Sequence, residues 1–297
     1  MPLVAIATCA ELPDLDDDER PLITALAEVG IEAVPVVWDD AAVDWPSFDA
    51  VVIRATWDYS KRHDEFVAWA RLVAGVTTLL NPASVVAWNT DKRYLRDLDA
   101  AGVPIVPTQF IELDADDQSW QPPAGFEEFV VKPVVSAGSR DTMRYSPITS
   151  GDAPARHVRR LLDGGEAVMI QPYLEAVDTI GETALIFIGG EFSHAIRKGQ
   201  MLSRDTEGQT VAGLYVQEDI QSRVATDAER AVAAAALAVI PGGSEQVLFA
   251  RVDVIPDASG APVVLELELT EPSLFFQHED AAAGRLAAAI LARLDRN

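Results

Sequence analysis

The stretch Val263–Pro272, VVLELELTEP, combines a run of Val and Leu typical of a buried strand with carboxylates at Glu266 and Glu268. Side chains alternate between the two faces of a strand, so these carboxylates point to one face while Leu265, Leu267 and Leu269 point to the other. One face of the predicted strand is therefore apolar and the other is acidic. Because parallel carboxylates repel each other unless a cation joins them, the acidic face is a candidate cation site.

The acidic face extends to the strand that comes before it. The segment LFARVDVIPDASGAP precedes the acidic strand, and together they predict a β-hairpin with a tight turn at Ser259-Gly260. That turn pairs Asp253 with Glu266 and Arg251 with Glu268. All four side chains would then share one face of the hairpin.

A divalent ion would resolve the repulsion between the opposed acids. Directly opposed side chains lie roughly 4.5–5.5 Å apart at Cβ, so Asp253 and Glu266 destabilise the hairpin unless a cation joins them. Carboxylate oxygens without His or Cys nearby suit Mg²⁺ or Mn²⁺ better than zinc, and Glu268 is a third candidate ligand. The alternative is a solvated strand face that carries an Arg–Glu ion pair. Spacing alone leaves both interpretations open.

A second group of candidate residues lies in FVVKPVVSAGSRDT, residues 129–142. Lys132 ends an apolar run, and Pro133 prevents the strand from continuing inside a sheet. A loop of small residues follows, and its members include Ser136, Gly138 and Ser139. The backbone N–H groups of such a loop can approach phosphate oxygens closely, and a Lys on the adjoining strand can reach the same anion. The alternative is an exposed Lys followed by an ordinary loop.

Familiar nucleotide motifs are absent from the sequence. It contains neither G-x-x-x-x-G-K-[ST] nor G-x-G-x-x-G, and it lacks the H-R-D and D-F-G elements of protein kinases. Any nucleotide site must therefore be of another kind.

Composition narrows the class of protein. The chain has 297 residues, 49% of them hydrophobic, and a formal net charge of -24, so we expect a sizeable core and no general attraction to nucleic acid or anionic membranes. A single cysteine, Cys9, leaves no internal disulfide, and no apolar run reaches the roughly 18 residues needed to span a membrane. The acidic start argues against a secretory signal, so we expect a cytoplasmic protein.

The elements that must position these residues can be predicted from periodicity and turn signals. Apolar runs at 3–9, 31–38 and 48–57, with helical spacing near 21–30 and 61–73, predict an opening βαβ-type domain. A first domain boundary is expected close to residue 88. Further elements are predicted as a helix from Thr90 or Asp91, a strand EEFVVKP, a helix near 154–163, a strand AVMIQPYL, a hairpin with Gly189-Gly190 at its tip, and a closing helix DAAAGRLAAAILARLD.

Taken in order, these features resemble the ATP-grasp superfamily. The matching motifs are Asp91-Lys92 at a helix start, the strand Lys132 with its SAGS loop, MIQPYLEAV, RVDV and LELE, which together cover roughly residues 85–290. The resemblance implies an α/β protein with an ATP-grasp fold. Its parts would be an N-terminal α/β domain at 1–88 and two α+β lobes, at 89–175 and 176–297, that clasp ATP between them.

The same resemblance implies roles for individual residues. It implies phosphate contacts from Lys92 and Lys132, adenine contacts from Gln171, Tyr173 and Leu174, and a ribose contact from Glu175 or Asp178. It also implies that Asp253 and Glu266 hold Mg²⁺ and that Arg251 lies beside the reacting phosphate. The family usually has Glu-x-Asn at the end of this strand, whereas Glu268 stands here where the Asn would be.

Within the superfamily, RATWDY at 54–59 resembles the O-ureido-D-serine cyclo-ligases of D-cycloserine biosynthesis. Arg54 follows an apolar strand and could reach the cleft, where its planar fork would bind a substrate carboxylate. The alternative is a strand-end Arg packed on Trp57. Arg197 and Lys198, at the end of another strand, could neutralise phosphate or substrate, or could simply face water.

The resemblance implies ATP-dependent activation of a carboxylate through an acyl phosphate. In the narrower family the nucleophile is a ureido nitrogen of the same molecule, which closes a five-membered ring. Two alternatives stay open: an intermolecular ligase that joins an amino acid to an amine, and a non-catalytic nucleotide-binding protein. The expected partners are ATP and a small amino-acid-like carboxylate, without nucleic acid or membrane, and the oligomeric state is left open.

Other polar features carry weaker expectations. DLDDDE at 14–19 resembles part of a calcium loop but lacks its Gly and its terminal Glu, so a solvated loop before a helix is expected. The histidines show no metal-ligand spacing, although His194 could reach the site from its place near Arg197. Cys9 is expected to be a small buried residue.

Overall fold

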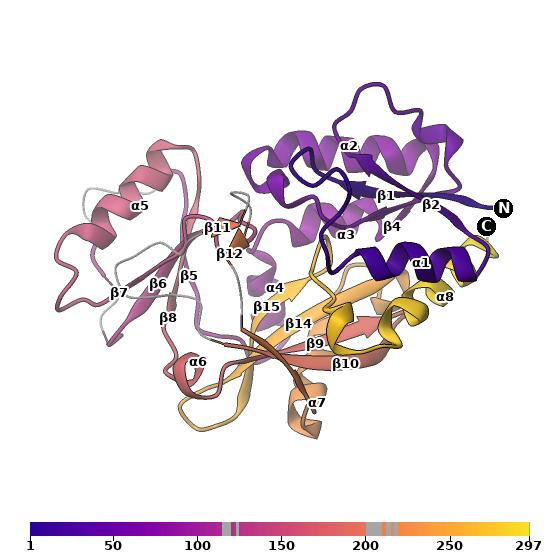
Figure 1. Cartoon of the computed structure of the whole chain (residues 1–297). Helices are drawn as coiled ribbons and strands as arrows, with labels where there is room; N and C mark the ends of the chain where they lie inside the picture. The colour runs from indigo at the N-terminus through magenta and orange to yellow at the C-terminus, as the bar shows by residue number, and fades with distance from the viewer. Residues whose placement is uncertain (115–119, 123–124, 200–209, 212–214, 217–218, 297) are drawn as a thin grey trace.

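The computed structural model describes residues 1–114, 120–122, 125–199, 210–211, 215–216 and 219–296. Its first part is a four-stranded parallel sheet with the strand order β2-β1-β3-β4. The strands and helices of this part are β1 (Leu3–Thr8), α1 (Arg20–Glu28), β2 (Glu32–Val37), β3 (Ala50–Ile53), α2 (His63–Val76) and β4 (Thr78–Leu80). Figure 1 shows α1 and α2 on opposite sides of this sheet, which agrees with the predicted βαβ-type opening.

Two short helices lead out of the N-terminal sheet, α3 (Ala83–Asn89) and α4 (Tyr94–Ala100). The predicted helix start at Thr90 or Asp91 falls between them, because Thr90 ends α3 and the chain turns again before α4. Residues of α4 join a core that also contains residues of the C-terminal sheet. The short segment between the two helices is thereby held against that sheet.

The central lobe is a four-stranded antiparallel sheet with the order β5-β8-β6-β7. Its elements are β5 (Gln109–Ile111), β6 (Phe129–Pro133), β7 (Met143–Tyr145), α5 (Ala153–Asp163) and β8 (Val168–Pro172). Strand β6 pairs with β8 so that Val130 lies opposite Gln171 and Lys132 lies opposite Met169. In Figure 1 this lobe stands apart from the rest of the molecule, with α5 covering its outer face.

The C-terminal lobe is a five-stranded antiparallel sheet with the order β13-β10-β9-β14-β15. Its elements are α6 (Ala176–Thr179), β9 (Glu182–Ile188), β10 (Glu191–Lys198), β13 (Ile220–Arg223), α7 (Asp227–Leu237), β14 (Phe249–Pro256), β15 (Pro262–Glu268) and α8 (Ala282–Leu294). A separate pair consists of β11 (Thr210–Val211) and β12 (Tyr215–Val216). The predicted turn at Gly189-Gly190 is confirmed, and both glycines have the positive φ that such a turn requires.

The β14–β15 hairpin has the predicted register where it matters for the site. Arg251 lies opposite Glu268 and Asp253 lies opposite Glu266. Hydrogen bonds link Arg251 to both Asp253 and Glu268, so these side chains share one face.

The predicted turn geometry of this hairpin is wrong, and a bulge corrects for it. Next to the turn Pro256 pairs with Pro262, whereas a two-residue turn at Ser259-Gly260 would pair Pro256 with the following residue. The register shifts at Leu265, which has no partner on β14. Leu265 was expected to join the apolar face of the strand. It packs instead beside Leu174 in a smaller cluster, and both side chains line a cavity between the two lobes.

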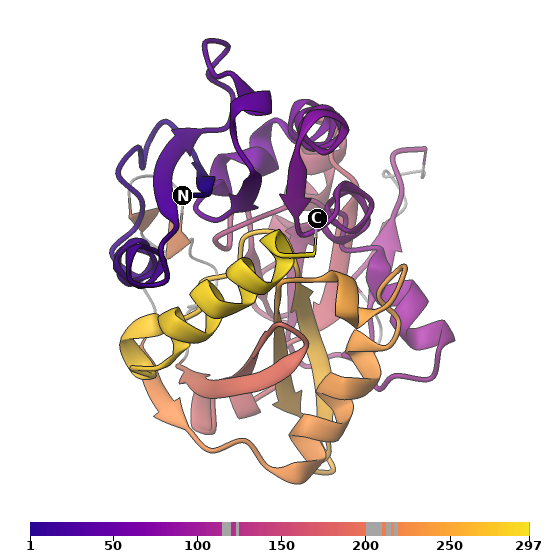
Figure 2. The same ribbon diagram turned by 90° about the vertical axis from the view of Figure 1, so that its right-hand side faces the viewer.

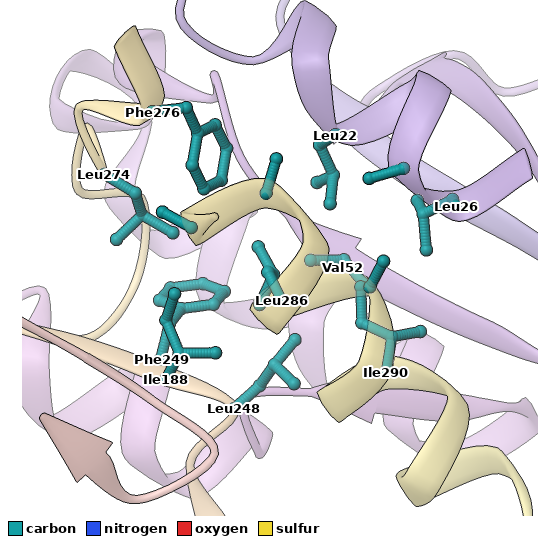
Figure 3. Packing of buried hydrophobic residues seen from close by; sticks show 14 of the residues in the cluster. Leu22, Leu26, Val52, Ile188, Leu248, Phe249, Leu274, Phe276, Leu286 and Ile290 are labelled. Carbon is teal, nitrogen blue, oxygen red and sulfur yellow. The ribbon is translucent and has the colours of Figure 1, made fainter. Parts of the chain in front are cut away.

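Helix α8 joins the N-terminal domain to the C-terminal sheet. Figure 2 shows it lying across the space between these two parts, and Figure 3 shows Leu286 and Ile290 close to the α1 residues Leu22 and Leu26. All four side chains are fully buried in one cluster that also includes Phe249 of β14. Burial of each such side chain contributes about 1.5–3 kcal/mol, so this contact holds the two parts in one fixed arrangement. No helix in the described part of the chain is both long and apolar enough to cross a membrane.

Candidate active site

A cavity of about 450 Å³ lies where the central lobe, the C-terminal sheet and loops of the N-terminal domain meet. Three sets of side chains line it. The apolar set includes Val130, Leu174, Val177, Ile255 and Leu265; the charged set includes Lys92, Lys132, Lys198, Arg251, Glu182, Glu266 and Glu268; and a third set includes Asp16, Asp17, Asp18, Trp57, Tyr59, Glu271, Ser273 and Phe275. The cavity therefore combines an apolar wall, a strongly charged centre and an acidic, aromatic wall.

Two predicted phosphate ligands meet at the charged centre. Lys92 is 7% exposed, and its ammonium donates to the backbone oxygen of Ser136 at 2.9 Å and lies 2.6 Å from Glu266 Oε1. Lys132 enters from β6 and makes no hydrogen bond or ion pair within the described residues. Burial lowers the pKa of Lys132, Glu266 opposes that change, and Lys92 lowers the pKa further. An anion in the cavity would offset both the burial and the mutual repulsion of these two lysines.

The loop after β6 also lines the cavity. Ser136, Gly138 and Ser139 all contribute to the lining, and the backbone turns through left-handed conformations at Gly138 and Ser139, with φ of 58° and 62°. Arg140 fixes the loop by pairing with Glu166 and by donating to the backbone oxygen of Val135 at 3.0 Å. A fixed loop that places successive backbone N–H groups beside a cavity is suited to bind phosphate oxygens.

Two cations, Lys198 and Arg251, contact Asp253 and Glu268 on the acidic face of the β14–β15 hairpin. Asp253 is 1% exposed and accepts from Lys198 at 2.7 Å and from Arg251 at 2.9 and 3.0 Å. Lys198 also lies 3.0 Å from Glu182, the residue directly opposite it on β9. Arg251 reaches across the hairpin to Glu268 at 2.5 Å. These contacts make one continuous charged network at the base of the cavity.

The carboxylates of this network titrate very differently. Burial would raise the pKa of Glu266, but the Lys92 and Lys132 ammonium groups lower it to about 2. Burial, joined by repulsion from Glu266 and Asp253 and opposed by Arg251, raises the pKa of Glu268 to about 7. Burial, followed by repulsion from Glu268, raises the pKa of Glu271 to about 8. Repulsion between neighbouring carboxylates thus adds to the effect of burial at Glu268 and Glu271.

Comparison with known proteins places this chain in a family. The model of the N-terminal domain of D-cycloserine synthetase DcsG matches residues 4–81. The cycloserine biosynthesis protein DcsG of Streptomyces lavendulae is 41% identical over 304 residues, covering 99% of both chains. The chain belongs to the D-cycloserine synthetase family. The crystal structure of D-cycloserine synthetase DcsG matches with a TM-score of 0.89 and 40% identity, over 98% of this chain and 99% of that chain.

More distant structures show the fold. A RimK domain ATP-grasp protein from Sphaerobacter thermophilus matches with a TM-score of 0.67 and 21% identity, over 97% of this chain and 99% of that chain. D-alanine–D-alanine ligase from Bacillus anthracis, complexed with ATP, matches with a TM-score of 0.67 and 15% identity, over 100% and 98%. The expected ATP-grasp fold, and the narrower family suggested by RATWDY, are therefore confirmed. ATP-grasp ligases use ATP and a divalent metal ion.

The donor set fits a divalent ion held by few protein ligands. Asp253 and Glu266 are opposed in register, and both are buried or half-buried carboxylates in contact with cations. Within the described residues no cluster of three or more His, Cys, Asp or Glu is arranged to hold a metal by itself. Mg²⁺ usually takes one or two carboxylates and completes its coordination with substrate phosphates and water. The arrangement fits that mode rather than an all-protein cage.

The predicted adenine contacts lie along the apolar wall. Gln171, Tyr173 and Leu174 all line the cavity, and Gln171 is fixed by a hydrogen bond from its Nε2 to Thr108 Oγ1 at 3.0 Å. Val130 and Ile255 contribute from the two lobes. An apolar slot with a fixed amide at its edge suits a flat heterocycle.

The two predicted ribose ligands lie outside the cavity lining. Glu175 is exposed beside the start of α6, and Asp178 accepts from the Tyr173 hydroxyl at 2.5 Å. Arg144 also lies 3.3 Å from Asp178 and over the Tyr173 ring. Asp178 therefore holds the segment between β8 and α6 in place. A ribose contact from Glu175 or Asp178 stays a prediction.

The structure places Arg54 behind the cavity. Its side chain is 1% exposed, forms a double contact with Glu19, and donates to the backbone oxygen of Pro272 at 2.7 Å. Its guanidinium also lies 4.8 Å from the centre of the Phe249 ring. Strand β3 ends at Ile53, so Arg54 points into the interface between the N-terminal domain and the C-terminal sheet. This placement supports a structural role and not the predicted contact with the substrate.

Lys198, and not Arg197, faces the charged centre. Neighbouring strand residues point to opposite faces, and Arg197 donates to the backbone oxygen of Ile180 on the far side of β10. The sequence contained the signal for this assignment, because Lys198 pairs with the acidic Glu182 across the hairpin. The Nε2 of His194 donates to the backbone oxygen of Leu274 at 2.9 Å, and His194 does not line the cavity. Cys9 is buried, as predicted, and burial raises the pKa of its thiol to about 11.

The acidic, aromatic wall was missed by the sequence analysis. The DLDDDE segment was expected to be solvated, but Asp16, Asp17 and Asp18 line the cavity, and Asp18 accepts from the backbone N–H of Phe275 at 2.8 Å. Burial, with repulsion from Glu19, raises the pKa of Asp18 to about 6. These residues are brought together by contacts across more than two hundred residues of sequence. Local sequence carries no signal for such a contact.

Side chains from α3 and α4 fix the free edge of β15. Asn89 donates to the backbone oxygen of Leu267 at 2.8 Å and accepts from the backbone N–H of Leu269 at 2.6 Å. The hydroxyl of Tyr94 accepts from the N–H of Leu267 at 2.9 Å. Because β15 is the last strand of its sheet, these side chains satisfy backbone groups that would otherwise be buried without partners. They hold the backbone on both sides of Glu268.

Proposed function

We propose that this protein uses ATP to cyclise O-ureido-D-serine to D-cycloserine. The observation that carries the proposal is a cavity in which Lys92, Lys132, Lys198 and Arg251 meet Glu266 and Glu268, in a chain that matches a cycloserine biosynthesis protein over 99% of its length. Such a centre can neutralise the charge of three phosphates while holding an organic carboxylate beside them.

The proposed reaction begins with attack of the substrate carboxylate on the γ-phosphorus of ATP. An oxygen–phosphorus bond forms, the bond to ADP breaks, and an acyl phosphate results. The ureido nitrogen bonded to oxygen then attacks the acyl carbon, loses its proton, and displaces phosphate to close the five-membered ring. Water finally removes the carbamoyl group as carbon dioxide and ammonia.

The residues of the charged centre have matching roles in this scheme. Lys132, which has no other partner in the described chain, would bind the transferred phosphate together with Lys92. Arg251 would stabilise the charge that develops as the carboxylate attacks, because its guanidinium already contacts Asp253 and Glu268 on the acidic face. Asp253 and Glu266 would hold a divalent ion, Mg²⁺ or Mn²⁺, which when bound supplies positive charge to the phosphates.

The test is an ADP-release assay with the purified full chain, followed by mass analysis of the product. ADP should form with O-ureido-D-serine and Mg²⁺-ATP alone, and the product should have the mass of D-cycloserine. A requirement for an added amine would instead indicate an intermolecular ligase. Absence of ADP with every carboxylate tested would indicate a nucleotide-binding protein without ligase activity.

A further inference from the structure

Glu271 is a buried acid of the cavity that lacks a basic partner. It lies three residues after Glu268, is 8% exposed and lines the cavity. Asp253, Glu266 and Glu268 each lie against a Lys or Arg, whereas Glu271 forms no ion pair in the part of the chain that the structure describes. A buried carboxylate of this kind favours a cation that arrives with a ligand.

The N-terminal domain holds Glu271 in position. The indole Nε1 of Trp57 donates to the backbone oxygen of Glu271 at 3.0 Å. The buried Tyr59 side chain lies close enough to the Glu271 carboxylate to favour its charged form. Trp57 and Tyr59 themselves line the cavity. The carboxylate is therefore fixed at the boundary between the charged centre and the aromatic wall.

This position matches the shape of an α-amino acid. The substrate carboxylate must lie beside the phosphates, close to Arg251 and Lys132. In an α-amino acid the ammonium nitrogen is only two bonds from the carboxyl carbon, so its partner must border the charged centre directly. Glu271 does so: it interacts electrostatically with Glu268 and with Lys92, and two residues further on the backbone oxygen of Ser273 accepts from Arg251 at 3.3 Å.

We propose that Glu271, positioned by Tyr59 and Trp57, binds the α-ammonium group of the organic substrate and so restricts the enzyme to α-amino carboxylates. This inference rests on the proposed function, because it assigns a partner to one group of the substrate that function requires. The raised pKa of Glu271 agrees with it, since an ammonium ion would supply the missing positive charge.

The neighbouring acids are less suited to this role. Asp18 already accepts a hydrogen bond from the backbone N–H of Phe275 and is only half-buried. The side chain of Asp17 is 75% exposed and lies 2.7 Å from Arg20. A solvated carboxylate with a basic neighbour contributes little to selection of a charged ligand.

The test compares two substrates and two proteins. The substrates are O-ureido-D-serine and 3-(ureidooxy)propanoate, which has hydrogen in place of the ammonium group. For the unaltered protein, kcat/KM for ADP formation should be about 10- to 100-fold higher with the amino compound, the value of one charge-assisted hydrogen bond. In Glu271→Gln this preference should shrink to about 1, mainly because KM rises for the amino compound and not for the analogue.

A matched control is Glu191→Gln, the same chemical change at the exposed far end of β10. It should keep the preference of the unaltered protein. Glu271→Gln should still show a rise in melting temperature with Mg²⁺-ATP, which demonstrates a folded nucleotide site. The inference is overturned if Glu271→Gln keeps the preference for the amino compound, or if it loses kcat equally with both compounds.

Failure of the proposed function gives a different result. In that case the unaltered protein releases no ADP with O-ureido-D-serine. Calorimetric titration of the same two compounds, in the presence of Mg²⁺ and ADP, then decides the role of Glu271. Tighter binding of the amino compound that disappears in Glu271→Gln supports the inference, and equal binding of both compounds overturns it.

Discussion

Asn89 offers a sharp test of how the acidic face is held. Its side-chain amide stands where a neighbouring strand would be, donating to Leu267 at 2.8 Å and accepting from Leu269 at 2.6 Å. Asn89→Leu has a similar volume and removes both hydrogen bonds without opening a large cavity. The backbone oxygen of Leu267 and the backbone N–H of Leu269 would then be buried without partners.

The size of the effect follows from these two groups. Each buried backbone group without a partner costs about 1–3 kcal/mol, so the free energy of unfolding should fall by roughly 2–6 kcal/mol. At about 2 °C for each kcal/mol in a chain of this size, the melting temperature should fall by roughly 4–12 °C. Because Glu268 lies between Leu267 and Leu269, kcat/KM for ADP formation should fall as well, with a larger effect at low Mg²⁺.

Urea unfolding of the full chain, followed by tryptophan fluorescence, measures the change. The control is Gln246→Leu, which removes a 2.6 Å amide hydrogen bond to Gly242 at the surface, where water can replace it. That variant should lose less than about 0.5 kcal/mol. Equal unfolding free energies for Asn89→Leu and Gln246→Leu would refute the argument that Asn89 satisfies the edge of β15.

Four further predictions concern the charged groups. Lys132→Ala should raise the KM for ATP and lower kcat without loss of stability, because the buried ammonium has no described partner; an unchanged ATP affinity would contradict this. Glu266→Gln should abolish most of the rise in melting temperature caused by Mg²⁺-ATP, and a full rise would argue against metal binding there. Arg54→Met leaves Glu19 buried without its partner, so stability measured by urea unfolding should fall by about 3–5 kcal/mol while the substrate KM stays near normal. Since the pKa of Glu271 rises from 4.5 to about 8 on folding, this acid's contribution to stability is full below pH 4.5 and is lost as the pH rises to about 8, so the ligand-free melting temperature of Glu271→Gln should fall less over that interval than that of the unaltered protein.

Several features of the site could be predicted because they depend on local spacing. Strand alternation puts Glu266 and Glu268 on one face, and the hairpin brings Asp253 opposite Glu266, as observed. The small-residue loop after Lys132 also lines the cavity. The predicted pairs Asp253–Glu266 and Arg251–Glu268 are correct only because the bulge at Leu265 offsets a turn that differs from the expected one. Spacing cannot reveal a bulge, because an unpaired residue has no signature of its own in a Val- and Leu-rich strand.

The remaining parts of the site depend on contacts between distant segments. Arg54 was expected in the cleft, yet its partners Glu19 and Pro272 lie 35 and 218 residues away, and they hold it behind the cavity. Residue type alone cannot tell a buried ion pair from a substrate contact, since both use the same guanidinium. The distinction comes from which surfaces the folded chain removes from water.

The sequence by itself determined the βαβ-type opening, the two hairpins of the C-terminal sheet, the acidic face, the small-residue loop after Lys132 and the family resemblance, because periodicity and motif order are local properties of the chain. It did not indicate shorter elements such as β4, β5 and β7. Only the tertiary structure decided that the DLDDDE segment reaches the cavity and that Arg54 lies behind it. It also decided that Glu271 is buried against Tyr59 without a basic partner. Burial and the field of neighbouring charges set the chemistry of such a carboxylate, and both exist only when segments far apart in sequence are packed together.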